Sequence, residues 1–268
     1  MTLLGLESNG TGPQLVWLHG FTQTKHAAPE FRSILTERFE VLTVDLPGHG
    51  ENADVSANLV ETAELLAHVL PREPLVIAGY SMGSRVALHF ALQFPERVRG
   101  VATIGTTRGI HDLAERRARR ERDEQLAARI RTIGVDTFLA EWREQEMFAQ
   151  LPAESRESRS HSAEGLARAL ESLGTGTQEW LGEELSRIAV PFTALAGTLD
   201  TKFAAEAAAI AESVPEGTCW LIENALHNPR LRQTHRPCVA TAESAPWHAM
   251  PPGAGSSSGT FARGTRLK

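Results

Sequence analysis

The sequence has few of the features that mark secreted, nucleic-acid-binding or membrane proteins. Its only cysteines, Cys219 and Cys238, show no paired spacing, so they indicate neither a disulfide scaffold nor a zinc site. The formal net charge of −6 argues against a general nucleic-acid binder. We find no basic, apolar leader and no apolar run long enough to cross a bilayer. These absences predict a cytoplasmic protein that contacts neither nucleic acid nor a membrane.

The sequence also lacks the patterns that hold metals and organic cofactors. No cluster of histidines and acids has ligand spacing, and no glycine-rich loop has the pattern that cradles phosphate. We therefore expect no metal and no cofactor. With 268 residues, 41% of them hydrophobic, the chain can bury a sizeable core within a single enzyme domain. The composition leaves a monomer and a small homo-oligomer both open.

The most informative segment is Gly-Tyr-Ser-Met-Gly at residues 79–83. It follows an apolar run at 75–78 and precedes a helix-like stretch at 84–88, which predicts a strand, a tight turn and a helix. In such a turn the serine has a strained backbone, and the small residues two positions before and after it let neighbouring segments pass. This context favours a catalytic Ser81. The alternative is a glycine-rich turn with a capping serine.

A second turn upstream supports the catalytic interpretation. Residues 15–18 have the pattern of a buried strand and run into His-Gly-Phe-Thr at 19–22, where backbone amides can face the same pocket as Ser81. We predict that the N–H groups of Phe21 and Met82 form an oxyanion hole, Met82 being favoured by its place at a helix N-terminus. The alternative is an ordinary turn from a strand into a loop.

A serine hydroxyl needs a histidine to take its proton, and the histidine needs a carboxylate to orient it. Downstream, an apolar strand candidate at 192–196 leads to Asp200, and another at 218–222 leads to His227. The chain order of Ser81, Asp200 and His227 is that of an α/β-hydrolase rather than of other serine triads. The alternatives are a turn-forming aspartate and a histidine in a surface loop.

Strand and helix patterns alternate between residues 14 and 104, with further strands expected at 41–44 and 98–104. This alternation predicts an α/β-hydrolase fold, in which a mainly parallel sheet is flanked by helices. The strand signal then stops and a polar, helix-patterned stretch follows, which we interpret as a helical cap inserted after the sixth strand position. The predicted organisation is a first core part at 1–104, the cap at 105–187, a second core part at 188–228 and an atypical tail at 229–268.

The predicted tail differs in kind from the rest of the chain. It contains six basic residues but only one acidic residue, Glu243, and it is rich in proline, glycine and serine. Such a composition predicts disorder. Because the fold normally needs a final helix here to fix the histidine loop, its loss would leave His227 mobile. We hypothesise that an out-of-frame or otherwise replaced C-terminus follows a normal enzyme body.

Arginines are the most informative residues for the substrate. Several crowd the segment 116–122 among acidic neighbours, and most of them are expected to form solvated pairs along a helix. Arg85 differs because it lies four residues after Ser81, one turn into the following helix and near the mouth of the pocket. The planar fork of an arginine there suits a carboxylate.

With these residues in view, the chain resembles the 2-succinyl-6-hydroxy-2,4-cyclohexadiene-1-carboxylate (SHCHC) synthases of menaquinone biosynthesis. The resemblance runs from about residue 14 to 228 and is carried by residues 18–24, 44–50, 79–87, 165–167, 174–178 and 195–203. The more specific parts are Arg85, the Gly-Thr-Gly-x-Gln stretch at 174–178, and Asp-x-Lys-Phe at 200–203. One departure is Leu226, which stands where the family has a glycine before the histidine.

The resemblance implies a lyase rather than a hydrolase. It implies that Ser81, activated by His227 and Asp200, acts as a base that removes a ring proton and triggers elimination of pyruvate. The negative charge of the enolate would then face the predicted oxyanion hole. The implied binding residues for the polycarboxylate substrate are Arg85, Arg120, Arg159, Tyr80 and Trp142. Arg119 and Arg156 are the alternatives that a small alignment shift would select.

Two other classes of function remain open at this point. The same triad can serve a hydrolase of small esters or carbon–carbon bonds. The altered tail favours a catalytically impaired protein or one that only binds a ligand. Turnover of neutral esters that does not depend on Arg85 would favour the hydrolase, and binding of a carboxylate without turnover would favour the impaired protein.

Overall fold

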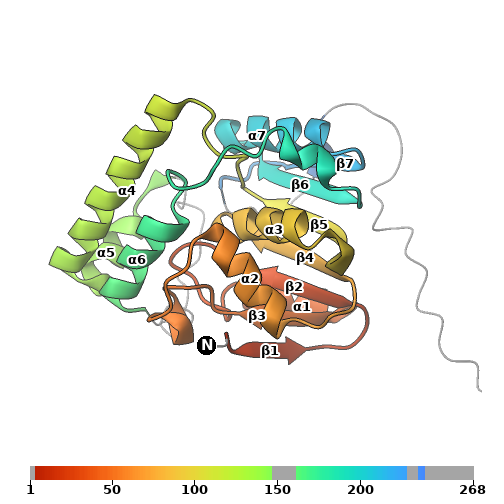
Figure 1. Cartoon of the computed structure of the whole chain (residues 1–268), viewed down its shortest axis with the longest axis horizontal. Helices are drawn as coiled ribbons and strands as arrows, with labels where there is room; N and C mark the ends of the chain where they lie inside the picture. The colour runs from red at the N-terminus through yellow and green to blue at the C-terminus, as the bar shows by residue number, and fades with distance from the viewer. Residues whose placement is uncertain (1–3, 147–160, 228–234, 239–268) are drawn as a thin grey trace, which may run out of the picture.

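A computed structural model describes residues 4–146, 161–227 and 235–238 of the chain (Figure 1). It contains one eight-stranded sheet with the strand order β1-β3-β2-β4-β5-β6-β7-β8. The strands are β1 (Leu6–Asn9), β2 (Gln14–Leu18), β3 (Glu40–Val44), β4 (Leu75–Tyr80), β5 (Val98–Ile104), β6 (Phe192–Gly197), β7 (Gly217–Ile222) and β8 (His235–Pro237). The helices are α1 (Pro29–Thr36), α2 (Leu59–Val69), α3 (Met82–Gln93), α4 (Leu113–Ile133), α5 (Val135–Arg143), α6 (Ala163–Leu173) and α7 (Thr201–Ser213), with 3-10 turns at Gly50–Asn52, Pro95–Arg97 and Glu184–Arg187.

The centre of the sheet is parallel, as the sequence predicted. Every pairing from β3 through β2, β4, β5 and β6 to β7 is parallel, while β1 and β8 add antiparallel edges. All six strands expected from apolar runs are present, because such runs are stable only where both faces of a sheet are covered. The short, polar strands β1 and β8 were missed, since their side chains carry no such signal.

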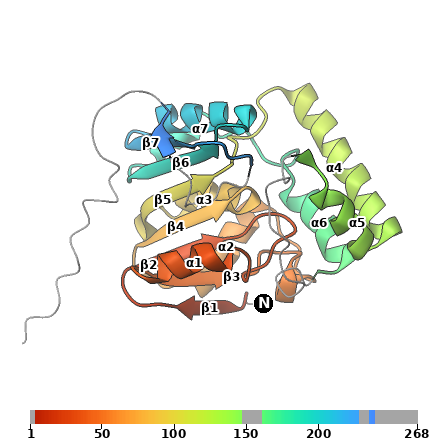
Figure 2. The same cartoon turned by 180° about the vertical axis from the view of Figure 1, so that it is seen from behind.

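Helices cover both faces of the sheet. On one face α2, α3 and α7 bury a large cluster that includes Val86, Phe90 and Ile210, and α2 and α3 lie in front in Figure 1. On the other face α1 packs its Phe31 edge-on to Trp17 of β2, with ring centroids 4.6 Å apart, and Figure 2 shows this helix in front. The alternation of side chains along each strand supplies both clusters.

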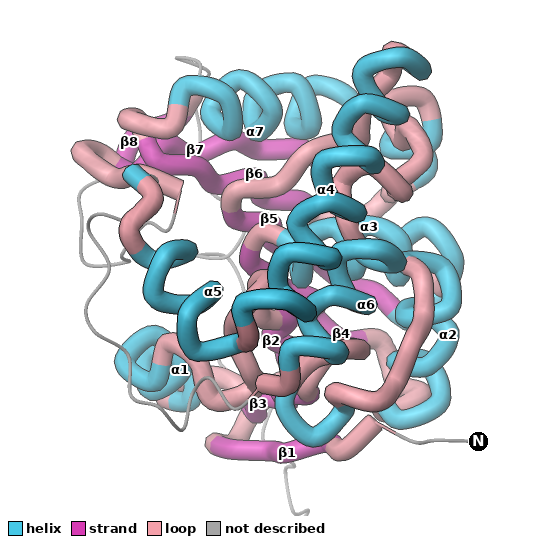
Figure 3. Tube along the Cα trace, turned by 90° about the vertical axis from the view of Figure 1, so that its left-hand side faces the viewer, coloured by secondary structure: helices cyan, strands magenta, loops and turns pink. Residues whose placement is uncertain are grey.

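Helices α4, α5 and α6 form a separate group beyond the ends of the strands, seen face-on in Figure 3. Their own apolar cluster includes Ile130, Phe138 and Leu166. This group falls within the predicted helical cap, whose boundaries at 105 and 187 stay a prediction. It follows β5, so five strands of this chain precede it, one fewer than the six positions of the expected pattern.

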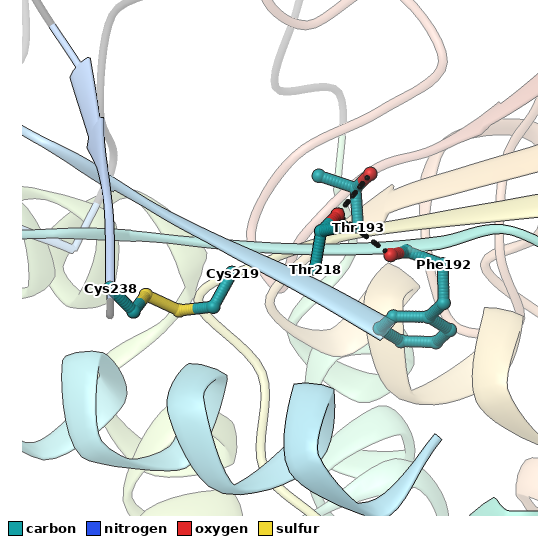
Figure 4. Close-up of a disulfide and its surroundings, with 5 residues drawn as sticks. All are labelled: Phe192, Thr193, Thr218, Cys219 and Cys238. Atoms are coloured by element: carbon teal, nitrogen blue, oxygen red, sulfur yellow. Dashed lines mark hydrogen bonds between the residues drawn. A yellow bond between two sulfur atoms is a disulfide. The ribbon is translucent and has the colours of Figure 1, made fainter. Parts of the chain in front are cut away.

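The C-terminal edge of the sheet holds a disulfide and corrects one prediction. Cys219 and Cys238, whose spacing indicated no disulfide scaffold, form a disulfide (Figure 4), because antiparallel pairing of β7 with β8 brings their Cα atoms to 5.2 Å. Sequence spacing alone does not reveal such a distance. His235–Pro237, which lies in the tail predicted to be disordered, is strand β8 because the open edge of β7 offers it hydrogen-bonding partners. The other residues of the predicted tail lie outside the described part of the chain.

Thr218, the residue before Cys219 in β7, bonds to strand β6 through its side chain. Thr218 Oγ1 donates a hydrogen bond to the carbonyl oxygen of Phe192 at 2.9 Å and lies 3.2 Å from Thr193 Oγ1 (Figure 4). These bonds join β7 to β6 through side chains as well as through the backbone.

Among all the residues with a described position, no helix combines the length and apolar composition of a membrane span.

Candidate active site

Ser81 occupies the sharp turn between β4 and α3 that the sequence predicted. Its φ of 51° and ψ of −108° lie outside the regions that non-glycine residues usually adopt. The Ser81 N–H donates to the carbonyl oxygen of Ile104 at 2.8 Å, which ties the turn to β5. A Cβ atom on Gly79 would collide with the backbone of Gly83, and one on Gly83 with the backbone at Leu18. The two glycines therefore allow the close packing that this strained turn requires.

The three predicted triad residues meet at the carboxyl ends of three strands. His227 Nε2 lies 3.1 Å from Ser81 Oγ, and His227 Nδ1 lies 3.0 Å from Asp200 Oδ2. The carboxylate favours a proton on Nδ1, so that the lone pair of Nε2 can accept the proton of the serine hydroxyl. The arrangement can therefore activate Ser81 as a base or as a nucleophile.

Asp200 serves both the triad and helix α7. Its Oδ1 accepts a hydrogen bond from the Phe203 N–H at 3.3 Å and so caps the helix, while Oδ2 faces His227. Burial alone would raise the pKa of this carboxyl, but the hydrogen bond and charge of His227, the Phe203 N–H and the charge of Lys202 together lower it by more, and the net pKa is below its usual value. The turn-forming role considered for Asp200 is thus part of the same arrangement.

Aromatic rings and one glycine fix the imidazole of His227. The Phe203 ring centroid is 4.3 Å from that of His227, and the Tyr80 centroid is 5.4 Å away. A Cβ atom on Gly105 would come within 2.9 Å of His227 Cε1, so this position has room only for glycine. His227 is 3% exposed and makes both triad contacts although Leu226 precedes it.

The turn at residues 19–22 is held in place by side chains. The Leu46 N–H donates to His19 Nε2 at 2.9 Å, and His19 Nδ1 bonds the carbonyl oxygen of Gly20 at 2.8 Å. Burial lowers the pKa of His19, which favours the neutral ring that this pair of bonds requires. No acceptor for the N–H of Phe21 or of Met82 lies among the described residues. Both amides are therefore available to an oxyanion.

A cavity of about 590 Å³ opens over the triad between the sheet and the cap. Ser81, His227 and Asp200 line its floor, and Trp142 of α5 and Arg119 of α4 line it from the cap. The Trp142 ring also packs against Phe21, with centroids 5.4 Å apart, which connects the cap to the predicted oxyanion turn.

Arg85 points a buried positive charge at this cavity. It is 7% exposed, and its Nη1 has no hydrogen-bond partner among the residues described. Burial, together with the positive charge of Arg119, lowers the pKa of Arg85 to about 10, although the charge of Asp123 acts in the opposite direction. A guanidinium that remains charged at neutral pH and has an unpaired N–H is a site for an anion.

One predicted cap arginine lies outside the cavity lining and one is not described. Arg120 is exposed, and its Nε pairs with Glu124 Oε1 at 3.2 Å, away from the cavity. Arg119 lines the cavity instead, because adjacent residues on a helix point in directions about 100° apart. Arg159 lies outside the described residues, as does its alternative Arg156. Tyr80, the last residue of β4, packs against the ring of His227 and is not among the residues that line the cavity.

This chain is similar to known proteins of the class that the geometry of the triad indicates, the α/β-hydrolases. A family model described as the alpha/beta hydrolase family matches residues 15–244. An SHCHC synthase from Citrobacter koseri is 34% identical over 238 residues, which cover 84% of this chain and 92% of the relative. The structure of MenH from S. aureus superposes with a TM-score of 0.78 at 30% identity, covering 85% of this chain and 92% of that one. The chain belongs to the alpha/beta hydrolase family and, within it, to the SHCHC synthases.

A second solved structure, an esterase, is less similar to this chain. A thermophilic esterase from Thermogutta terrifontis, solved with malate bound, has a TM-score of 0.69 at 26% identity and covers 84% of this chain and 86% of its own. Both values are below those of the S. aureus protein. The predicted α/β-hydrolase fold and the predicted resemblance to SHCHC synthases are therefore confirmed. The hydrolase match also extends past residue 228, where the resemblance was expected to end.

Several cavity residues in this SHCHC synthase homologue were not predicted. Lys202, Phe203, Thr106 and Thr175 all line the cavity. Lys202 and Phe203 belong to the Asp-x-Lys-Phe stretch and Thr175 to the Gly-Thr-Gly stretch, so the motifs that carried the family resemblance were the available signal. Thr106 follows β5 without any such motif. Within the described ranges, no group of three or more histidine, cysteine or acidic side chains has the arrangement of a metal site.

Proposed function

We propose that this chain is an SHCHC synthase, a lyase that eliminates pyruvate from 2-succinyl-5-enolpyruvyl-6-hydroxy-3-cyclohexene-1-carboxylate in menaquinone biosynthesis. The observation that carries the proposal is a complete Ser81–His227–Asp200 hydrogen-bond chain opening into a cavity lined by Arg85, a buried arginine whose Nη1 has no hydrogen-bond partner in the described part of the chain. Membership in the SHCHC synthase family supplies the reaction.

In the proposed mechanism Ser81 acts as a base. His227 Nε2 takes the proton of the Ser81 hydroxyl, and the serine oxygen removes a ring proton from the substrate. The electrons of the broken ring C–H bond form a new ring double bond through an enolate. The C–O bond to the enolpyruvyl group then breaks, and the departing enolpyruvate gains a proton and becomes pyruvate. Substrate atoms are redistributed between two products, and no water is consumed.

The backbone amides of Phe21 and Met82 are proposed to stabilise the enolate. Both N–H groups lack acceptors among the described residues, and Met82 is the first residue of α3, where the helix dipole favours negative charge. Donors fixed before the reaction need no reorganisation as the charge develops.

We further propose that Arg85 and Arg119 bind carboxylates of the substrate. Both line the cavity, and so do Trp142 and Lys202. An uncharged ester would form no ionic interaction with these cations. The carboxylates of the substrate, in contrast, can supply the hydrogen bonds that the arginines lose when they are shielded from water. A role for Arg159 also remains a proposal. The small anionic substrate, the cytoplasmic location and the monomeric or small oligomeric state are parts of the same proposal.

The test is a coupled assay that generates the enolpyruvyl precursor from isochorismate and 2-oxoglutarate and follows the release of pyruvate. We expect release by the wild-type protein and almost none by Ser81→Ala, because the triad acts as a unit. Circular dichroism of the variant provides the control for folding.

Two outcomes would contradict this function. A folded wild-type protein that releases no pyruvate but hydrolyses neutral p-nitrophenyl esters would be a hydrolase. A folded protein that binds the precursor and turns over neither substrate would be the impaired enzyme considered from the sequence.

A further inference from the structure

We propose that Asp123 is a positioning residue that holds Arg119 toward the cavity and thereby aligns the carboxylate-binding cations before the substrate arrives. This inference rests on the proposed function and deepens it. Asp123 itself does not line the cavity and is not expected to touch the substrate.

Asp123 connects two parts of the cap with its two oxygens. Oδ1 accepts a hydrogen bond from Arg119 Nε at 2.9 Å, one turn earlier on α4. Oδ2 accepts one from the Gly176 N–H at 3.3 Å, in the turn that follows α6. The residue is only 5% exposed, so its carboxylate depends on these partners for the hydrogen bonds that water would otherwise supply.

The glycines of the Gly-Thr-Gly stretch make this contact possible. A Cβ atom on Gly174 would come within 2.7 Å of Asp123 Oδ2, and one on Gly176 would collide with the backbone of Arg120. Only a turn without side chains at these two positions approaches α4 this closely. Thr175, between the glycines, lines the cavity, so the same contact positions a second wall residue.

The charges around the cavity give Asp123 a role before substrate binds. Arg85 and Arg119 repel each other, as the effect of Arg119 on the pKa of Arg85 indicates, and Asp123 opposes this effect. Because the repulsion acts before any anion is bound, a fixed carboxylate behind Arg119 keeps the two cations together. A substrate carboxylate then meets an aligned pair.

Helix α4 also contains a matched control. Arg120 and Glu124 form the same pair at the same spacing, one residue further along, but their side chains are 60% and 52% exposed and lie outside the cavity. A change in Glu124 therefore removes an equivalent charge from the same helix without disturbing Arg119.

The first experiment compares Asp123→Asn with Glu124→Gln in the pyruvate-release assay. We expect Asp123→Asn to raise KM about tenfold with little change in kcat, because the lost alignment affects ground state and transition state alike. Asp123→Glu should recover part of the loss. Glu124→Gln should leave both constants unchanged. An unchanged KM in Asp123→Asn, or an equal loss on a neutral ester, would overturn the proposal.

The second experiment needs no turnover. Arg119 is identified in the ¹⁵N–¹H spectrum of the full chain by the loss of its Nε–H signal in Arg119→Lys. We expect the wild-type signal to be protected from solvent exchange and the Asp123→Asn signal to lose that protection at an unchanged melting temperature. Retained protection would overturn the proposal even if the wild-type protein released no pyruvate. The failure of the proposed function is thus distinguishable from the failure of this inference.

Discussion

Ser81 and His227, the serine end and the histidine end of the triad, follow strands that differ in how deeply they are buried. Ser81 follows β4, in which all six residues are buried and which has parallel neighbours on both sides. His227 follows β7, in which only Ile222 is buried and whose outer neighbour is the three-residue strand β8. The position of the serine is therefore a property of the core, whereas the position of the histidine depends on local contacts at an edge. Elements with fewer buried contacts open at lower free energy.

The largest expected effect comes from removing the carboxylate at the histidine end. In Asp200→Asn an amide group replaces the acceptor at His227 Nδ1, so the ring proton moves to Nε2 and the histidine no longer accepts the serine proton. We expect kcat for pyruvate release to fall by roughly 10⁴, as in other serine triads. Circular dichroism should report an intact fold. A loss of less than about tenfold would mean that Asp200 does not orient His227 for catalysis.

A change at the serine end should depend on the substrate. Arg85→Ala removes the buried guanidinium and is expected to cost about 2 to 4 kcal/mol of transition-state stabilisation for the polycarboxylate. A neutral ester should be turned over at nearly the wild-type rate. The measurement is kcat/KM for both substrates with both proteins, and equal losses would contradict the carboxylate-binding role.

The disulfide offers a way to loosen the histidine end alone. Replacing Cys219 and Cys238 together by serine removes a cross-link with a sequence separation of 19, worth about 3 kcal/mol of stability in chain-entropy terms. We expect amide hydrogen exchange to become faster in β7 and around His227 and to stay unchanged in β4. Equal acceleration in both strands would mean that the two ends are not independent.

The smallest effect concerns acid stability. Because the pKa of Asp200 is lower in the folded protein than in the unfolded chain, ionised Asp200 stabilises the fold above its unfolded pKa, near 4. That contribution is lost as the pH falls through the folded pKa. Urea unfolding between pH 6 and about pH 3 should therefore show a smaller acid-dependent loss in Asp200→Asn than in the wild type. Identical pH dependence would show that the carboxylate has no net favourable interaction.

The triad could be predicted from the sequence, whereas the choice between the two cap arginines could not. Ser81, Asp200 and His227 were predicted because each follows an apolar run, and the carboxyl ends of neighbouring parallel strands meet at one edge of the sheet. Choosing Arg119 over Arg120 as the cavity residue required the rotational setting of α4, which its arginine-rich sequence does not reveal.

Contacts between distant segments were beyond sequence reasoning. The pairing of β8 with β7, and the disulfide that goes with it, depend on proximity at the sheet edge. The bridge from Asp123 to Gly176 likewise joins residues that are far apart along the chain. The Gly-Thr-Gly stretch was noticed only as a mark of resemblance, and its physical reason is the close approach to α4.

The most direct test of the account is a single-turnover measurement with a substrate deuterated at the ring carbon that loses its proton. If Ser81 removes that proton, pyruvate release should be slower from the deuterated substrate, and mass spectrometry should find no adduct on Ser81. Equal rates together with a covalent adduct on Ser81 would contradict the account, because the serine would then act as a nucleophile.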